Sequence, residues 1–196
     1  MSSINLTYLG HACFKVESDN YSIILDPYKG VKGFEDIEGD CNEVLCSHDH
    51  FDHAYVDKLN ITKKKSPFDL KTIESYHDDS RGTKRGHNTI TVISKDNKKI
   101  VHLGDLGHTL DRETLEFLKY TTVLLIPIGG TYTIDSDTAI KVINDINPKY
   151  IVPMHYKDKD KGLEVLEDID IFLNKASSFK DKLKLVRGYN TCFVIN

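Results

Sequence analysis

The segment CSHDHFDH brings together four side chains of the kind that bind metal ions in proteins. His48 and His50 lie two residues apart, and Asp52 and His53 follow directly after the apolar run EVLC. Residues two apart in an extended chain point to the same side, so His48 and His50 can bind one ion. If the chain then turns into a helix, Asp52 and His53 can reach a second ion. The spacing therefore predicts two adjacent metal sites.

Three further candidate ligands follow later in the chain, each close to the end of a β-rich run. His77 could complete the first pair to three nitrogens, and His155, in PMHY, could join the second pair. Asp105, in LGDLGH, has two carboxylate oxygens with which to bridge both ions. Imidazole and carboxylate ligands suit zinc, and also manganese and iron. We predict two divalent metal ions, with zinc preferred and manganese or iron as alternatives, bound by His48, His50, Asp52, His53, His77, Asp105 and His155.

The predicted pair of ions would provide the chemistry of a hydrolase. Two neighbouring cations can share a water molecule and lower its pKa from near 15.7 to roughly 7. The resulting hydroxide attacks a carbonyl or phosphoryl centre, and the second cation stabilises the negative charge that develops on the oxygen. Loss of either ion is therefore expected to damage the rate.

Three other histidines lie close to these segments. His11, in LGHACF, either lines the mouth of the site and binds substrate or is a buried residue bonded to neighbouring backbone. His108, three residues after Asp105, either binds substrate or orients a metal ligand by a hydrogen bond without binding the ion itself. His102 lies inside an expected strand and is interpreted as a core residue with its hydrogen bonds satisfied.

Two loops that contain glycine are candidates for substrate binding. The segment RGTKRG, with Asn88 after it, could present Arg85 or backbone N–H groups to an anionic substrate, because glycine permits tight turns. The alternative is an ordinary hairpin loop. In GGTYTID, residues 129–131, including Thr131, could shape the floor of the active site while Asp135 caps the next helix. A purely structural role is the alternative here too.

Strands are expected to carry most of these residues, because function commonly sits in the loops that follow strands. Apolar and polar residues alternate over 4–26, with a turn at SDN, and predict an antiparallel series. Further β-rich runs occur at 43–47, 71–76, 88–94, 99–104, 123–128 and 150–154.

Helices are expected between the later strands, where apolar residues recur three to four apart. They begin at 111, with Asp111 as the N-cap, at 137 and at 163. An antiparallel series followed by alternating strands and helices predicts two sheets with helices packed outside. We therefore predict an α/β fold with four layers in the order αββα. A chain of 196 residues suits one well-packed domain, 1–196.

Composition excludes several classes of partner. The 26 basic and 30 acidic residues are mixed along the chain and give a formal net charge of −4, so there is no basic stripe for nucleic acid. No apolar stretch is long enough for a membrane helix and no leader is visible. The four cysteines form no CxxC pair and predict reduced thiols. We expect a cytoplasmic protein with a small-molecule substrate, and both a monomer and a homo-oligomer remain open.

Taken in order, these motifs resemble the metallo-β-lactamase superfamily. They are most similar to its branch of small metal-dependent hydrolases that includes ascorbate-6-phosphate lactonase. The resemblance covers about residues 6–156 and implies an αββα sandwich of two similar halves, with metal ions at one edge of the sheets. It also implies one ion at His48, His50 and His77, another at Asp52, His53 and His155, and Asp105 as the bridge. The motifs are LGHACF, LDP, SHDHFDH, HDD, GTKRGHN, HLGDLGH, GGTYTID and PMHY.

The expected function is a metal-dependent hydrolase that cleaves an ester, lactone or phosphoester bond of a small soluble substrate. The resemblance implies catalytic roles for Asp105, which bridges the ions, and for Asp52, which would pass a proton to the leaving group. Only about 20 residues separate LDP from SHDH, and no substrate-covering domain follows PMHY, so no particular substrate is implied. The alternatives are a metal-dependent ligand-binding or sensing protein without turnover, and a nuclease of the same superfamily.

Overall fold

The first sheet is built from the antiparallel series at the start of the chain. The computed structural model describes residues 3–196. Strands β1 (Ile4–Gly10), β2 (Cys13–Ser18) and β3 (Tyr21–Leu25) pair in sequence, and alternate residues of β1 are buried as the pattern predicts. Two further strands extend this sheet: β5 (Glu43–Leu45) runs parallel to β3, and β12 (Thr191–Ile195) pairs antiparallel with β1.

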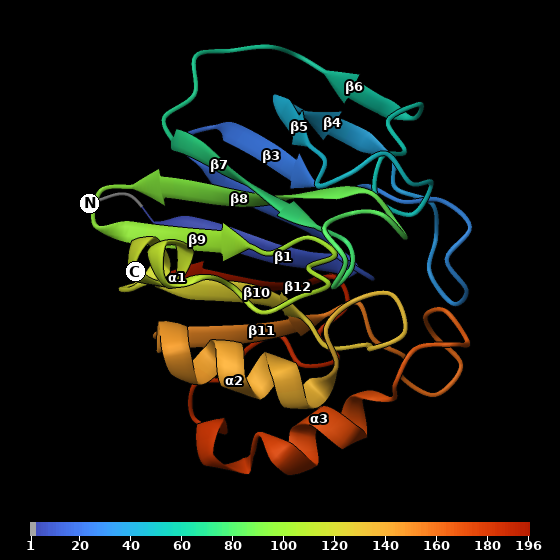
Figure 1. Cartoon of the computed structure of the whole chain (residues 1–196). Helices are drawn as coiled ribbons and strands as arrows, with labels where there is room; N and C mark the ends of the chain where they lie inside the picture. Colours follow the sequence, from blue (N-terminus) through green and yellow to red (C-terminus); the bar gives the residue numbers. More distant parts are fainter. Residues whose placement is uncertain (1–2) are drawn as a thin grey trace.

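The second sheet has the order β11-β10-β9-β8-β7. Strands β7 (Asp69–Tyr76), β8 (His87–Lys95) and β9 (Lys98–His102) are antiparallel neighbours, whereas β10 (Val123–Pro127) and β11 (Tyr150–Met154) run parallel to β9. Strands β7, β9, β10 and β11 therefore all end at the same edge of the sheet, and the arrowheads of β7, β9 and β11 point the same way in Figure 1. That edge is where the predicted ligands follow.

The two sheets stack face to face around a shared apolar core. Leu6, Phe14 and Leu25 of the first sheet belong to the same buried cluster as Ile93 and Leu125 of the second. Each fully buried side chain of this size contributes roughly 1.5–3 kcal/mol to the free energy of unfolding. The stacked sheets confirm the predicted α/β sandwich.

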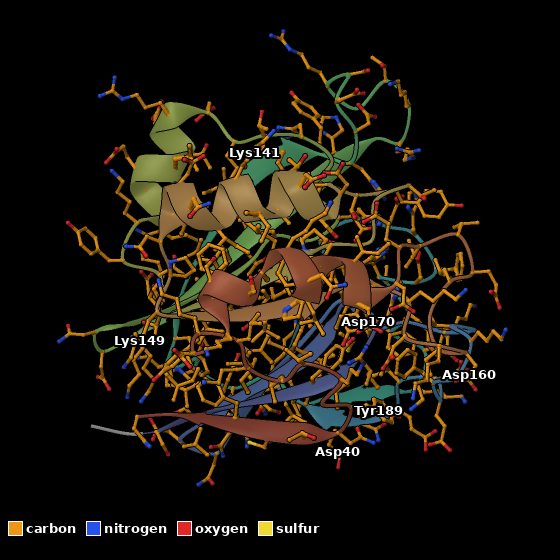
Figure 2. All side chains as sticks on the ribbon, turned by 90° about the horizontal axis from the view of Figure 1, so that it is seen from below. Asp40, Lys141, Lys149, Asp160, Asp170 and Tyr189 are labelled. Atoms are coloured by element: carbon orange, nitrogen blue, oxygen red, sulfur yellow. The ribbon has the colours of Figure 1, made fainter. Side chains whose placement is uncertain are left out.

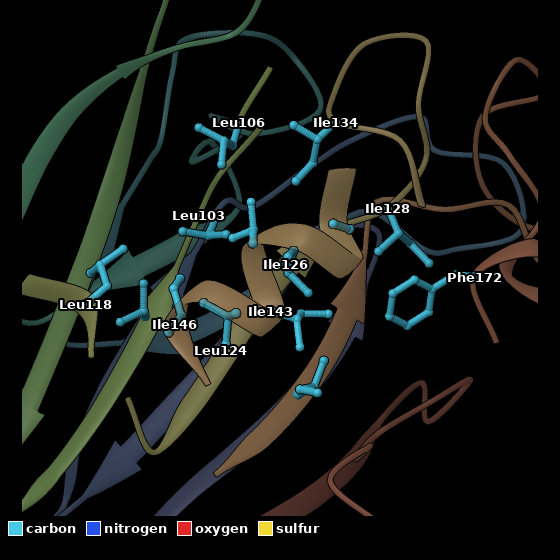
Figure 3. Packing of buried hydrophobic residues seen from close by; sticks show 14 of the residues in the cluster. Leu103, Leu106, Leu118, Leu124, Ile126, Ile128, Ile134, Ile143, Ile146 and Phe172 are labelled. Carbon is cyan, nitrogen blue, oxygen red and sulfur yellow. The ribbon is translucent and has the colours of Figure 1, made fainter. Parts of the chain in front are cut away.

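Within residues 3–196, three α-helices pack on the outer face of the second sheet. Helix α1 spans Arg112–Leu118, α2 spans Ser136–Ile146 and α3 spans Ile169–Lys175, followed by a short 3₁₀ turn at Ser177–Phe179. Leu124 and Ile126 of β10 join Ile143 and Ile146 of α2 and Phe172 of α3 in one cluster (Figure 3). This is one of the two helical layers that were predicted.

A second helical layer was predicted on the outer face of the first sheet, but an irregular segment covers that face instead. Within residues 3–196, no helix packs there; Ile24 of β3 and Cys13 of β2 pack against an irregular segment that includes Tyr28, Val31 and Ile37. Two short parallel strands, β4 (Gly39–Cys41) and β6 (Leu59–Ile61), complete this cover. Glycines 30, 33 and 39 all have positive φ values, which interrupts any helix in this segment.

The expected helix starts are confirmed at two places and wrong at one. Asp111 and Asp135 cap α1 and α2 by accepting backbone N–H bonds from residues three positions later. The helix expected from 163 begins only at Ile169, after the cap Asp168. Its first residues are held by other segments, because the Glu167 N–H donates to the Gly129 carbonyl and the Ile169 N–H donates to that of Lys157.

Charged side chains of both signs cover the surface of the sandwich. Figure 2 shows this for the exposed Lys141, Lys149, Asp160 and Asp170, which come from different parts of the chain. The mixture agrees with the small formal net charge of −4. Within residues 3–196, no helix combines the length and apolar character needed to cross a membrane.

Candidate metal centre

The predicted ligands meet at the edge of the sandwich where the strands end. His77 directly follows β7, His155 directly follows β11, and Asp105 lies three residues after the end of β9. His48 lies three residues after β5 of the first sheet. The sheet topology therefore gathers side chains that are more than 100 residues apart in the sequence.

The first group consists of His48, His50 and His77. One ligand atom from each residue lies within 4.8 Å of those of the other two. The ring centroids of His48 and His50 are 4.5 Å apart, and those of His50 and His77 are 5.2 Å apart. The chain bends from residue 47 to residue 50, so His48 and His50 meet without the extended segment that was expected between them.

The second group consists of Asp52, His53 and His155, with His11 as a fourth member. The chain reaches Asp52 and His53 through a single turn, in which the Ala54 N–H donates to the His50 carbonyl at 2.9 Å. A full helix is not needed for this change of direction. The His11 Nε2 atom lies 3.3 Å from Asp52 Oδ2, and its ring centroid is 4.2 Å from that of His155.

Asp105 lies between the two groups. Its Oδ2 atom is 3.2 Å from Nε2 of His77 in the first group, and 3.3 Å and 3.2 Å from Nε2 of His53 and His155 in the second. The side chain of Asp105 is almost fully buried. A carboxylate in this position can contact ions held by either group.

Three of the histidines are oriented by hydrogen bonds at the ring nitrogen that faces away from the cluster. His53 Nδ1 donates to Asp26 Oδ2 at 2.7 Å, and His77 Nδ1 donates to the Tyr132 carbonyl at 2.9 Å. His48 Nδ1 is 2.9 Å from the hydroxyl of Ser47. Such bonds select the tautomer whose Nε2 lone pair faces inward, which is typical of histidines that bind metal ions.

Several buried polar atoms of the cluster have no hydrogen-bond partner. Within residues 3–196, six buried side-chain nitrogen or oxygen atoms lack a partner, and all six belong to this cluster. A buried polar atom without a partner costs about 1–3 kcal/mol. Ligation of metal ions would satisfy four of these atoms, namely Nε2 of His48, His53 and His155 and Oδ1 of Asp105, so the residues present fit a metal centre. The atoms are Nδ1 of His11, Nε2 of His48 and His53, Oδ1 of Asp105, and both ring nitrogens of His155.

The charge states of these side chains follow from burial and from the neighbouring carboxylates. Burial, with His53 nearby, lowers the pKa of His48 to about 3. Burial opposes the charged forms of His53 and His77, but Asp105 raises the pKa of both, and Asp26 adds to the effect at His53. Burial also opposes the charge of Asp105, yet His155 and His53 hold its pKa well below the ordinary value.

Two residues support the ligands in a way that the sequence analysis did not predict. Asp26, in LDP, accepts hydrogen bonds from the Ser47 backbone and hydroxyl at 2.7 and 2.6 Å, as well as from His53. Asn88 is fully buried and accepts the Asp105 N–H at 2.8 Å while donating to the Leu103 carbonyl. The signal for Asp26 was an acidic residue directly after the apolar strand β3.

The three further histidines that the sequence analysis considered differ in their positions. His11 is buried beside the second group and so lies away from the mouth where substrate binding was considered. His108 accepts the Tyr76 N–H at Nε2 and donates to the Thr109 carbonyl from Nδ1, which holds the backbone next to His77. His102 bonds to the Ala12 carbonyl and accepts the Gly104 N–H, as expected for a core residue.

A pocket of about 620 Å³ opens onto the cluster. His50, Asp52, His77 and Asp105 form the cluster side of its wall, and Arg85 lies on another side. Thr131 does not line the pocket. Its hydroxyl donates a hydrogen bond to the carbonyl of Val165, and Val165 does line the pocket. The volume is within the range of small-molecule sites, about 300–1,000 Å³.

Comparison with protein families gives a match over most of the chain. Residues 5–155 match the family described as "Beta-lactamase superfamily domain", and His155 is the last residue matched. A protein from Carboxydothermus hydrogenoformans named metal-dependent hydrolase is 27% identical, covering 78% of this chain and 84% of its own length. A protein of the same name from Nanoarchaeum equitans is 28% identical, covering 86% and 100%.

Solved structures show the same architecture. A Thermotoga maritima protein, interpreted as a Zn-dependent hydrolase of the metallo-β-lactamase superfamily, has a TM-score of 0.69 and 33% identity, covering 88% of this chain and 85% of its own. A metallo hydrolase from Ignicoccus hospitalis has a TM-score of 0.73 at 22% identity, covering 99% of both chains, and supports the fold. The chain therefore belongs to the beta-lactamase superfamily and is a metal-dependent hydrolase.

Proposed function

We propose that this hydrolase uses two divalent metal ions to cleave an ester, lactone or phosphoester bond of a small soluble substrate. The observation that carries the proposal is the set of six buried polar atoms without partners, all within one cluster that borders a pocket. We propose zinc as the metal, with manganese and iron as alternatives. We treat the chain as one catalytic domain that acts in the cytoplasm, in keeping with four cysteines that are all free.

Under this proposal the two groups of ligands hold one ion each. His48, His50 and His77 would hold the first, and Asp52, His53 and His155 the second. Ions bound there would polarise the substrate and lower the pKa of a water molecule to about 7, so that hydroxide is available at neutral pH. Asp105, whose Oδ2 atom approaches histidines of both groups, would bridge them.

Asp52 is the proposed proton carrier. It belongs to the second group and also lines the pocket, so it can contact substrate. Burial opposes its charge, but His11 and His53 hold its pKa below the ordinary value, which keeps it an ionised carboxylate at neutral pH. His11 Nε2, 3.3 Å away, holds this carboxylate in place. Asp52 could then pass the proton to the leaving group, as general acid–base catalysis requires.

Metal content and activity test the proposal together. Protein purified without added metal should contain about two equivalents by elemental analysis, and it should hydrolyse members of a panel of lactones, carboxylic esters and phosphodiesters. Asp105→Ala should lose both metal and activity. Asp145→Ala is the matched control, because Asp145 is exposed near the C-terminal end of α2 and does not line the pocket.

Three results would argue against the proposal. Activity in a metal-free wild-type protein would overturn the metal mechanism. Binding of panel compounds, seen as a higher melting temperature without product, would favour a sensing protein. Cleavage restricted to nucleic acids would favour a nuclease. The similarity to ascorbate-6-phosphate lactonase stays a prediction, and the lactones of the panel address it.

A further inference from the structure

Arg85 differs from the other charged residues around the pocket. Three charged side chains outside the metal cluster line it: Lys84, Arg85 and Glu164. Lys84 pairs with Asp79 at 2.7 Å, and Glu164 pairs with Lys32 and Lys157. Among residues 3–196, no carboxylate lies within ion-pair distance of the Arg85 guanidinium. The pocket thus contains one cation that is not neutralised by a neighbour.

The backbone that carries Arg85 is held firmly by one buried carboxylate. Asp78, only 2% exposed, accepts backbone N–H bonds from Ser80, Gly82, Lys84 and Arg85 at 2.7–2.9 Å. The loop closes with bonds from the Gly86 N–H to Gly82 and from the His77 N–H to Gly86. A loop fixed in this way loses little conformational entropy when it binds a ligand.

Tyr132 links the position of Arg85 to that of the metal cluster. Its ring lies under the guanidinium, 5.4 Å from ring centroid to Cζ, while its carbonyl accepts the hydrogen bond that orients His77. The stacked ring restricts where the guanidinium can lie. Tyr132 therefore positions both Arg85 and His77, and both of these residues line the pocket.

The rest of the wall is largely apolar. Phe51 is 56% exposed, Val165 is 53% exposed and Tyr132 is 37% exposed, and Leu163 lies beside them. Exposed apolar side chains grouped around a polar centre are typical of ligand-binding sites. A ligand with an apolar body would cover them.

We propose that the site takes small amphipathic anions: an ester or lactone with an apolar or aromatic body and a carboxylate or phosphate group remote from the bond that is cleaved. The anionic group binds Arg85, the body covers Phe51, Tyr132 and Val165, and the bond lies at the cluster. Guanidinium binds both carboxylate and phosphate with two parallel hydrogen bonds. The assignment of substrate class rests on the proposed hydrolytic function.

The test uses two substrates of equal acyl length that differ in one charge. These are 4-nitrophenyl hexanoate and the mono-4-nitrophenyl ester of adipic acid. In the zinc-loaded protein, Arg85→Gln should lower kcat/KM for the adipate ester by about 10- to 100-fold, the value of a charge-assisted hydrogen bond. It should change kcat/KM for the hexanoate ester by less than about twofold. Arg85→Lys, which keeps the charge, should restore part of the loss.

Arg81→Gln is the matched control. Arg81 is an exposed arginine of the same loop, makes no contribution to the pocket wall, and loses the same charge in the variant. It should leave kcat/KM for both esters unchanged. Melting temperatures of all variants show whether each is folded.

A binding measurement separates this inference from the proposed function. Calorimetry with 3-phenylpropionate, benzylphosphonate and the uncharged 3-phenylpropanol should show binding of the two anions that Arg85→Gln weakens. If that pattern holds without hydrolysis of any ester, the ligand class stands and the hydrolytic proposal fails. If Arg85→Gln affects the charged and uncharged compounds equally, or if the anions bind equally well to the variant, the inference is overturned. Binding of only one anion identifies which group is recognised.

Discussion

Substitution of Asp26 by asparagine should weaken metal binding without removing a ligand. The carboxylate is buried and accepts three hydrogen bonds, from the Ser47 N–H and hydroxyl and from His53 Nδ1 at 2.7 Å. If the NH₂ group of the asparagine faced His53, two hydrogen-bond donors would face each other. If its carbonyl oxygen faced His53, the hydrogen bond would form with a neutral acceptor in place of a charged carboxylate. A hydrogen bond to a charged group contributes about 1.5–3 kcal/mol, which equals roughly 10- to 150-fold in an equilibrium constant. Loss of groups that orient metal-bound histidines typically weakens metal binding by about 10- to 100-fold.

We therefore expect the dissociation constant of the ion at His53 to rise by about 10- to 100-fold in Asp26→Asn. Competition with a chromophoric chelator measures this constant for each ion. Asp111→Asn is the control, because Asp111 caps α1 at the surface and asparagine is an equally good cap. Unchanged metal affinity in a folded Asp26→Asn protein would refute the idea that Asp26 orients His53.

Three further predictions concern the same cluster. Metal affinity should fall as the pH drops, because the raised pKa values of His53 and His77 mean that each must lose a proton to bind an ion. Calorimetry of metal binding in buffers of different ionisation enthalpy should detect proton release at pH 7. Metal binding without proton release would contradict this prediction. Removal of metal with EDTA should lower the melting temperature by at least about 5 °C, since four buried atoms of the proposed ligands would lose their partners at about 1–3 kcal/mol each. An unchanged temperature in calorimetric scans would count against bound ions. Asn88→Ala should lower the free energy of unfolding by about 2–4 kcal/mol in urea titrations, whereas Asn60→Ala, at an exposed site, should have little effect.

The sequence predicted the parts of the fold and cluster that depend on local pattern. Alternation over 4–26 marked three strands, and Asp111 and Asp135 marked two helix starts, because a cap and an apolar period act within a few residues. The cluster followed from the same kind of signal. Each candidate ligand stands at the end of an apolar run, and the parallel strands then bring those ends together.

Features that depend on distant contacts were missed or wrong. Strand β12 pairs with β1 across nearly the whole chain, and no local pattern in TCFVI specifies that partner. The helix expected from 163 starts late because bonds to Gly129 and Lys157 hold its first residues. Asp26 acts on His53, and Asn88 on Asp105, through contacts that form only when the sheets are stacked.

The backbone at the cluster is strained in a way that metal ions would not relieve. His11, Asp26 and His155 all have φ values between 45° and 53°, a region that costs a residue with a Cβ atom roughly 1–2 kcal/mol. The strands hold them there: the His155 N–H donates to the His11 carbonyl, and the Asp26 N–H donates to that of Leu45. Because these bonds are made between backbone groups, they persist whether or not an ion is present. The ligand positions are therefore set before metal binds, and the proton release and heat of metal binding should report changes at the imidazole and carboxylate groups, with little contribution from folding of the chain.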